Sequence, residues 1–215
     1  MKRLMTVLAL AALTAAPAAA QWFGMPVWNS PKGGTGVTIN GDLGIPNTNG
    51  GKGTAFGARA TVGLANLSLT AGLASWKPKG AVDNVTSVGG NAAFKVIGGS
   101  LIPVALNLQI GAARAGAANG DSATTRLTAG AGVAVSVPTP GISIEPYLSI
   151  TNRWYKASGI TGTTSNLGWT LGANANFGMF GVHLAYDSES YGGLIGTVGT
   201  FGLGAHVALK APIGM

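Results

Sequence analysis

The chain has 215 residues and a mean hydropathy of +0.36, with 9% charged residues and 36 glycines. Soluble domains carry roughly 25% charged residues, so this composition argues against a soluble globular protein and favours a single membrane domain. The net charge of +7 comes from basic residues scattered along the chain, which argues against the clustered basic face of a nucleic-acid-binding protein.

Residues 1–20 have the organisation of a secretory signal peptide. A basic pair at 2–3 precedes an apolar run at 4–16, and the small residues 18–20 predict cleavage before Gln21. An N-terminal membrane anchor is the alternative, but the run is short and rich in alanine. The chain contains no cysteine, so neither disulfides nor lipid attachment through cysteine is available.

The segment that follows, residues 21–34, is too rich in proline and glycine for a regular strand. Three placements are open for it: under the mouth of the domain, inside the domain as a plug, or at the inner membrane interface. Beyond it we expect the folded domain over 35–209 and a short C-terminal tail over 210–215.

Within 35–209 apolar and polar residues alternate with a period of two, which is typical of β-strands. The clearest case is 142–155, where isoleucine and leucine alternate with serine, glutamate and tyrosine. No apolar run after the signal peptide reaches the roughly 20 residues that a membrane-spanning helix needs. The pattern predicts strands near 35–43, 54–64, 67–76, 88–97, 104–113, 124–137, 142–155, 166–177, 181–188 and 197–209.

The connections between these strands alternate between short turns and long polar loops. An even strand number with long loops at one end is the layout of outer-membrane barrels. We therefore predict an all-β fold, a closed antiparallel up-and-down transmembrane barrel of about ten strands, with eight or twelve as alternatives. The predicted location is the bacterial outer membrane.

The charged residues provide a test, because they did not set the register. A basic residue facing lipid at mid-bilayer costs roughly 2–4 kcal/mol, so charges belong on the inner face. Those within the predicted strands all fall on the polar side, together with both histidines. The candidate lumen-facing residues are Arg59, Lys95, Glu145, Tyr147, Arg153, His183, Asp187 and His206.

Several aromatic residues fall near the long-loop ends of their strands, where amphipathic rings favour the lipid headgroup level. A preference of aromatic residues for strands in general is the alternative explanation. The candidate members of this aromatic girdle are Trp76, Trp154, Tyr155, Trp169 and Tyr186.

Two short motifs resemble those of the small outer-membrane β-barrel proteins of Gram-negative bacteria. One is the Glu-Pro-Tyr-Leu start of the strand at 145–148. The other is 204–209, whose Gly204, Val207 and Leu209 are similar to the C-terminal assembly signal of that family. The resemblance implies insertion by the barrel-assembly machinery, although this chain continues past Leu209 and does not end on an aromatic residue.

No motif predicts catalysis, a metal site or a cofactor. The glycine-rich stretch 50–54 lacks the first glycine and the following helix of a phosphate-binding loop. His183 and Asp187 lie four residues apart on one strand, about 13 Å, which is too far for a direct hydrogen bond. Two histidines, no cysteine and scattered acids form no recognisable metal-ligand set.

The predicted lumen is lined mainly by small residues, so it is either filled with water or plugged. We expect a non-enzymatic barrel, structural or a narrow pore for a small solute, that contacts outer-membrane lipid and lipopolysaccharide. The alternatives are a barrel enzyme that acts on lipid or peptide at the cell surface and a secreted glycine-rich adhesin.

Overall fold

The structure is a computed structural model that describes residues 22–28, 31, 33, 35–98, 102–193 and 196–209. The predicted signal peptide and the tail over 210–215 lie outside these residues. The described strands are β1 (Gly36–Pro46), β2 (Thr54–Leu64), β3 (Leu67–Lys77), β4 (Val85–Ile97), β5 (Val104–Ala115), β6 (Thr124–Val135), β7 (Val137–Thr139), β8 (Ile142–Ala157), β9 (Thr164–Phe177), β10 (Phe180–Ser190) and β11 (Thr197–Leu209).

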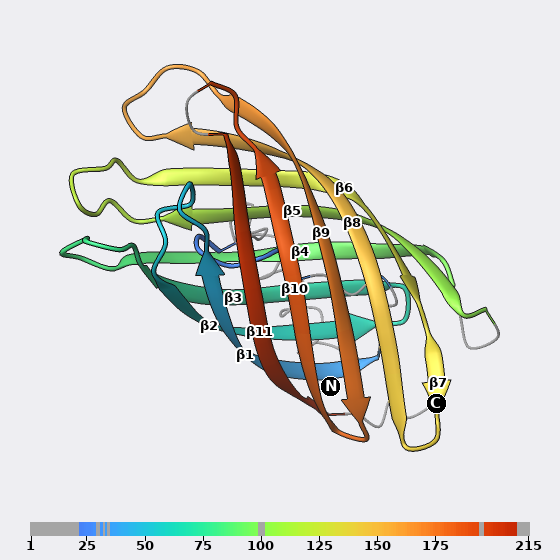
Figure 1. The fold of residues 1–215 in the computed structure, drawn as a ribbon. Helices are drawn as coiled ribbons and strands as arrows, with labels where there is room; N and C mark the ends of the chain where they lie inside the picture. The colour runs from blue at the N-terminus through green and yellow to red at the C-terminus, as the bar shows by residue number, and fades with distance from the viewer. Residues whose placement is uncertain are drawn as a thin grey trace, which may run out of the picture.

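Neighbouring strands pair antiparallel in chain order, and the first strand β1 pairs with the last strand β11 (Figure 1). The additional pairing of β6 with β8 makes the ring continuous. The structure thus confirms a closed up-and-down barrel, in which each of the ten long strands has a partner on both sides within the described residues, and only the short β7 pairs on one side, with β8.

The short β7 continues the line of β6, so the two together count as one of the ten strands of the barrel wall. The break falls at Ser136, whose amide donates to the carbonyl of Pro103, and β6 and β7 keep one register along β8. Pro138, inside β7, has no amide hydrogen to give. The sequence predicted a single strand over 124–137, and this irregularity is the main departure.

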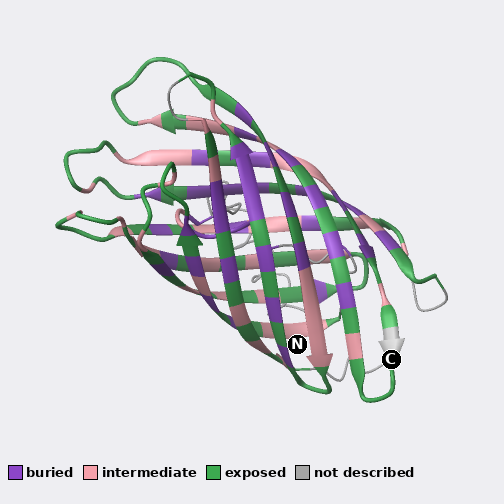
Figure 2. Cartoon of the chain, in the orientation of Figure 1, coloured by how far each residue is buried: buried purple, intermediate pink, exposed green. Residues whose placement is uncertain are grey.

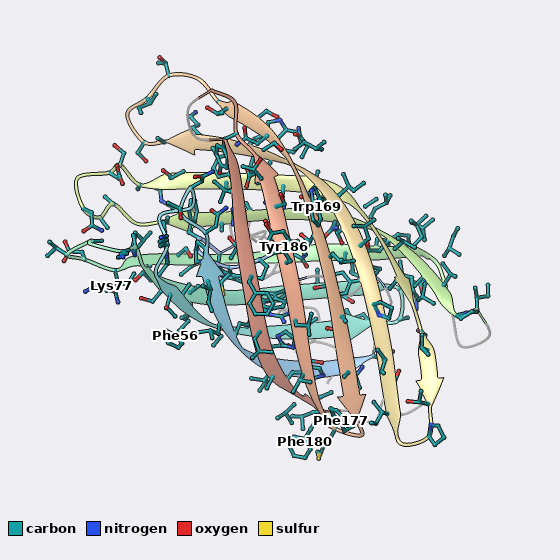
Figure 3. All side chains as sticks on the ribbon, viewed as in Figure 1. Phe56, Lys77, Trp169, Phe177, Phe180 and Tyr186 are labelled. Carbon is teal, nitrogen blue, oxygen red and sulfur yellow. The ribbon has the colours of Figure 1, made fainter. Side chains whose placement is uncertain are left out.

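Burial alternates along the strands, as the bands of buried and exposed residues in Figure 2 show. In β8, for example, Ile144, Leu148 and Ile150 are exposed, whereas Glu145 and Ser149 are buried. The outward side chains are apolar on all sides of the barrel, including the labelled Phe56, Phe177 and Phe180 in Figure 3. The inside of this barrel is polar and its outside apolar, which is the reverse of a soluble barrel.

The two ends of the barrel differ. The connections 47–53, 78–84, 116–123 and 158–163, with the described residues 191–193 and 196, form the long-loop end, and tight turns such as Ala65-Asn66 form the short-turn end. Gly178, in the two-residue turn between β9 and β10, has φ +67°, which favours glycine. Among the described residues no helix has the length and apolar character needed to cross a membrane.

Candidate functional site in the barrel lumen

The N-terminal segment lies inside the barrel. We call residues 22–28 together with Pro31 the lumenal segment. Most of its apolar side chains are almost fully buried, with Val27 2% and Trp28 6% exposed, and Phe23 is partly buried. Of the three placements that the sequence left open, the structure supports the plug.

The lumenal segment runs along the barrel axis, with its first residues at the long-loop end. Near that end, the amide of Phe23 donates to Ser87 Oγ over 3.2 Å, and Arg126 donates to the carbonyl of Trp22. Halfway down, the Trp28 ring packs edge-on against His183, with 4.7 Å between centroids. The segment therefore fills the lumen from the long-loop end to the middle of the barrel.

The small residues of the barrel wall make room for this segment. A Cβ atom added to Gly202 would lie 2.5 Å from Pro26 and 2.7 Å from Trp28, and one added to Gly57 would lie 3.0 Å from Met25. At Gly202 the rings of Pro26 and Trp28 would have to move, whereas at Gly57 the end of the Met25 side chain would have to shift slightly. The small residues that the sequence predicted to line the lumen thus leave the space that the lumenal segment occupies.

Below the lumenal segment, four ionisable side chains form what we call the central cluster: Asp42, Arg59, His183 and His206. Arg59 donates from Nε to Asp42 Oδ2 over 2.8 Å, and Nε2 of His183 lies 2.6 Å from Asp42 Oδ1. On its other side, Nδ1 of His183 lies 3.3 Å from Nδ1 of His206, so one of the two rings must donate to the other. The cluster joins strands β1, β2, β10 and β11 across the seam that closes the barrel.

A polar cavity of about 350 Å³ lies between the central cluster and the short-turn end. Side chains from both sides of the barrel line it, including Asn40, Thr70, Tyr147, Asn174 and His206. His206 also contacts Asn176, with 2.9 Å between Nε2 and Oδ1. The lumen is therefore filled by the lumenal segment toward the long-loop end, and is polar and hollow toward the short-turn end.

A second group of charges lies close to the long-loop end. This long-loop cluster consists of Arg126, Arg153, Tyr155, Asp187 and Glu189. Arg153 donates to Asp187 through both Nη1 and Nη2, over 2.8 and 2.7 Å, and from Nη1 to Glu189 over 2.9 Å. The Tyr155 hydroxyl donates to Glu189 Oε2 over 2.7 Å, and Arg126 donates to Tyr155.

The long-loop cluster contains two arginines and two carboxylates, so its formal charges balance. Just beyond it, Tyr191 packs against Tyr155 with 5.9 Å between ring centroids. Burial raises the pKa of Tyr191, and the neighbouring Glu189 raises it further, so this hydroxyl stays protonated at neutral pH. The cluster braces β6, β8 and β10 around the end of the lumenal segment.

The candidate lumen residues fall into different groups in the structure. His183 and His206 belong to the central cluster together with Arg59, whereas Arg153 and Asp187 belong to the long-loop cluster. Glu145 and Tyr147 are buried on the inward face of β8. Lys95 lies on the same parity near the short-turn end of β4 and is partly exposed.

Asp42, Arg126 and Glu189 are the charged residues of the two clusters that are not among the candidates of the sequence analysis. Asp42 follows Thr38 and Asn40 on one face of β1, and this alternation is the signal that could have identified it. Glu189 was assigned to a loop, because β10 extends two residues further than the apolar pattern predicted. His183 and Asp187 are not partners of each other, as their spacing along the strand predicted.

Only part of the predicted aromatic girdle faces outward. Trp169 and Tyr186, which are labelled in Figure 3, are exposed on the outer face. Their ring centroids lie 5.8 Å apart, and Trp154 is on the outward side of β8. Trp76 and Tyr155 were assigned wrongly, because both are on the inward faces of their strands. Trp76 packs against the buried core that includes Trp22 and Met25 of the lumenal segment, and Tyr155 belongs to the long-loop cluster. They were selected because they lie near the long-loop ends of their strands, and that position does not show which face of the strand a side chain occupies.

The three candidate assembly residues all lie in β11. Val207 and Leu209 are outward, whereas Gly204 lies beside the central cluster. A Cβ atom at Gly204 would overlap His183 and would lie 2.6 Å from Asp42 Oδ1. Packing inside the barrel is therefore sufficient to require glycine at this position.

Comparison with known proteins gives structural likenesses only, since no protein-family model matches the chain and no curated protein matches it. The outer membrane enzyme PagL is 10% identical, with a TM-score of 0.44 over 80% of this chain and 99% of PagL. The beta domain of the Bordetella autotransporter BrkA is 11% identical, with a TM-score of 0.44 over 84% and 100%. Neisserial surface protein A is 14% identical, with a TM-score of 0.41 over 81% and 98%. The assignment of the fold rests on the strand pairing of this chain itself.

Proposed function

We propose that this chain is an integral protein of the bacterial outer membrane, a sealed structural barrel that is neither an open pore nor an enzyme. The apolar exterior supports a lipid environment, because it presents exposed leucine, isoleucine and phenylalanine side chains all round. The lumenal segment is the observation that carries the proposal. It occupies the lumen from the long-loop end to the middle of the barrel, through which a diffusing solute would have to pass.

The central cluster supports a structural role as well. Both carboxylate oxygens of Asp42 are engaged, one by Arg59 and one by His183. Trp28 packs on His183 from the long-loop side. A substrate at the cell surface would therefore have to displace the lumenal segment before reaching the histidine.

Conductance in planar bilayers tests the proposal. We expect no unitary channels from the full protein, and discrete channels from a variant that lacks residues 22–31, because its small-residue wall would then enclose a water-filled lumen. Heat-modifiable migration of both proteins on SDS gels provides the control for folding. Channels of equal conductance in both proteins would show that the segment does not seal the lumen.

Fractionation of cells tests the location separately. Recovery of the protein in the outer-membrane fraction, with a shift in gel migration on boiling, is the expected result. A soluble periplasmic protein without that shift would overturn the proposed location, whatever the bilayer experiment shows.

A further inference from the structure

Two basic residues meet on the outer surface of the barrel at the long-loop end. Arg114 near the end of β5 pairs with Thr125 of β6, and Thr125 pairs in turn with Lys156 of β8. All three share the outward parity of their strands, since Ile110, Leu127 and Ile150 on the same parities are exposed. Adjacent strands lie about 4.8 Å apart, so the Cα atoms of Arg114 and Lys156 are about 10 Å apart, and both long side chains can reach one ligand.

The surface between these residues is hollowed. A depression of about 390 Å³ is lined by Arg114, Thr125, Lys156, the last residue of β8 and residues 158–161 of the following loop. Arg114 donates to Thr125 Oγ1 over 3.2 Å and to Ser158 Oγ over 3.4 Å. These two bonds hold the guanidinium in the hollow and leave part of its five-donor fork for a ligand.

The next rows down the barrel are apolar. Directly below the basic pair, the residues on the outward side of the same three strands are Ala112, which is buried, Leu127 and Trp154, and they are paired side by side. Ile110, which is 61% exposed, follows one row lower. The basic pair thus lies where the apolar band ends, with a tryptophan at the boundary, and this is the level of lipid headgroups.

We propose that Arg114 and Lys156 bind the phosphate of a phosphorylated outer-leaflet lipid, with the acyl chains lying along Leu127 and Ile110. The inference rests on the outer-membrane location proposed above. Arginine is suited to this role because its planar fork binds phosphate through two parallel hydrogen bonds, and the lysine adds a second positive charge. Ile160, exposed on the loop above the hollow, borders the site on the side away from the bilayer.

Native mass spectrometry of the purified full protein in zwitterionic detergent, with lipid A as the probe, tests the site. We expect the R114Q/K156Q variant to bind lipid A at least about fivefold more weakly, since two charge-assisted contacts are removed. The matched control is K77Q/K79Q, which removes two charges at the long-loop end of β3 (Lys77 is labelled in Figure 3). The control is expected to bind within twofold of the unchanged protein.

A second arm uses lipid A from which the phosphates have been removed. We expect it to bind the unchanged protein as weakly as lipid A binds R114Q/K156Q. Equal losses in both double variants would overturn the site in favour of diffuse attraction, and equal binding of the two lipids would overturn the role of phosphate. Heat-modifiable migration of the same samples reports folding independently, so a failed lipid site is distinguishable from a failed barrel assignment.

Discussion

Arg153 is the buried cation that binds both carboxylates of the long-loop cluster. It is 1% exposed, and its guanidinium is surrounded by Asp187, Glu189 and the hydroxyl of Thr151. Taking three charges out of water is costly, and the hydrogen bonds among them offset that cost only while all partners are present. Arg153 therefore contributes little net stability while its partners are present, but its loss would leave Asp187 and Glu189 buried without a cation.

Replacing Arg153 with alanine is expected to destabilise the folded barrel by about 3–5 kcal/mol, because Asp187 and Glu189 would remain buried without their cation. The measurement is denaturant unfolding in detergent, followed by tryptophan fluorescence. Replacing Lys77, which is exposed at the end of β3, with alanine serves as the control and should change stability by less than about 0.5 kcal/mol. Comparable losses in the two variants would contradict the role assigned to the long-loop cluster.

At the scale of the element, the strands of the wall and the lumenal segment specify each other. β11 carries glycine at 202 because Pro26 and Trp28 occupy the space where a side chain would project. The outward neighbours of this glycine, Phe201 and Leu203, are large and exposed. β11 thus has a glycine where it faces the lumenal segment and large apolar residues where it faces outward.

A valine at position 202 is expected to displace the lumenal segment and open the lumen, since its side chain overlaps Pro26 and Trp28. Conductance in planar bilayers should then appear without any deletion. Gly41→Val is the matched control, because a Cβ atom at Gly41 on β1 meets nothing within 4 Å. A silent G202V barrel of normal fold would show that the segment tolerates the added side chain.

The fold could be predicted from the sequence because burial on one face and lipid on the other impose a strict period of two. The same period placed Arg59, Arg153 and both histidines inward without any knowledge of their partners. The partners could not be predicted, because Asp42 and His183 are 141 positions apart and meet only through the closure of β1 on β11. The position of the lumenal segment was equally hidden, since it has no periodic pattern of its own.

At the scale of the whole molecule, the barrel has a defined polarity. The start of β1 and the end of β11 meet at the short-turn end, where Val37 pairs with Leu209. Long loops of outer-membrane barrels face the outside of the cell. The short-turn end and the polar cavity above it therefore face the periplasm in the proposed location.

Single cysteines can test this polarity, since the chain has no cysteine of its own. We expect Ser122→Cys in the 116–123 loop to react with a membrane-impermeant maleimide on intact cells, and Asn66→Cys in a short turn to react only after permeabilisation. Val27→Cys, buried in the lumenal segment, should react only after denaturation. The opposite order for the first two would mean that the barrel is inverted.

The lumenal segment also has a consequence for the order of events during assembly. It precedes β1 in the chain and contacts the wall at Gly57 in β2, yet it also touches Gly202 in β11, the strand made last. A closed wall offers no side entrance, so the most direct sequence of events lays the segment against the early strands while the seam is still open. We expect the seam to close over it afterwards, so that the lumenal segment becomes the template around which the final strand is fitted.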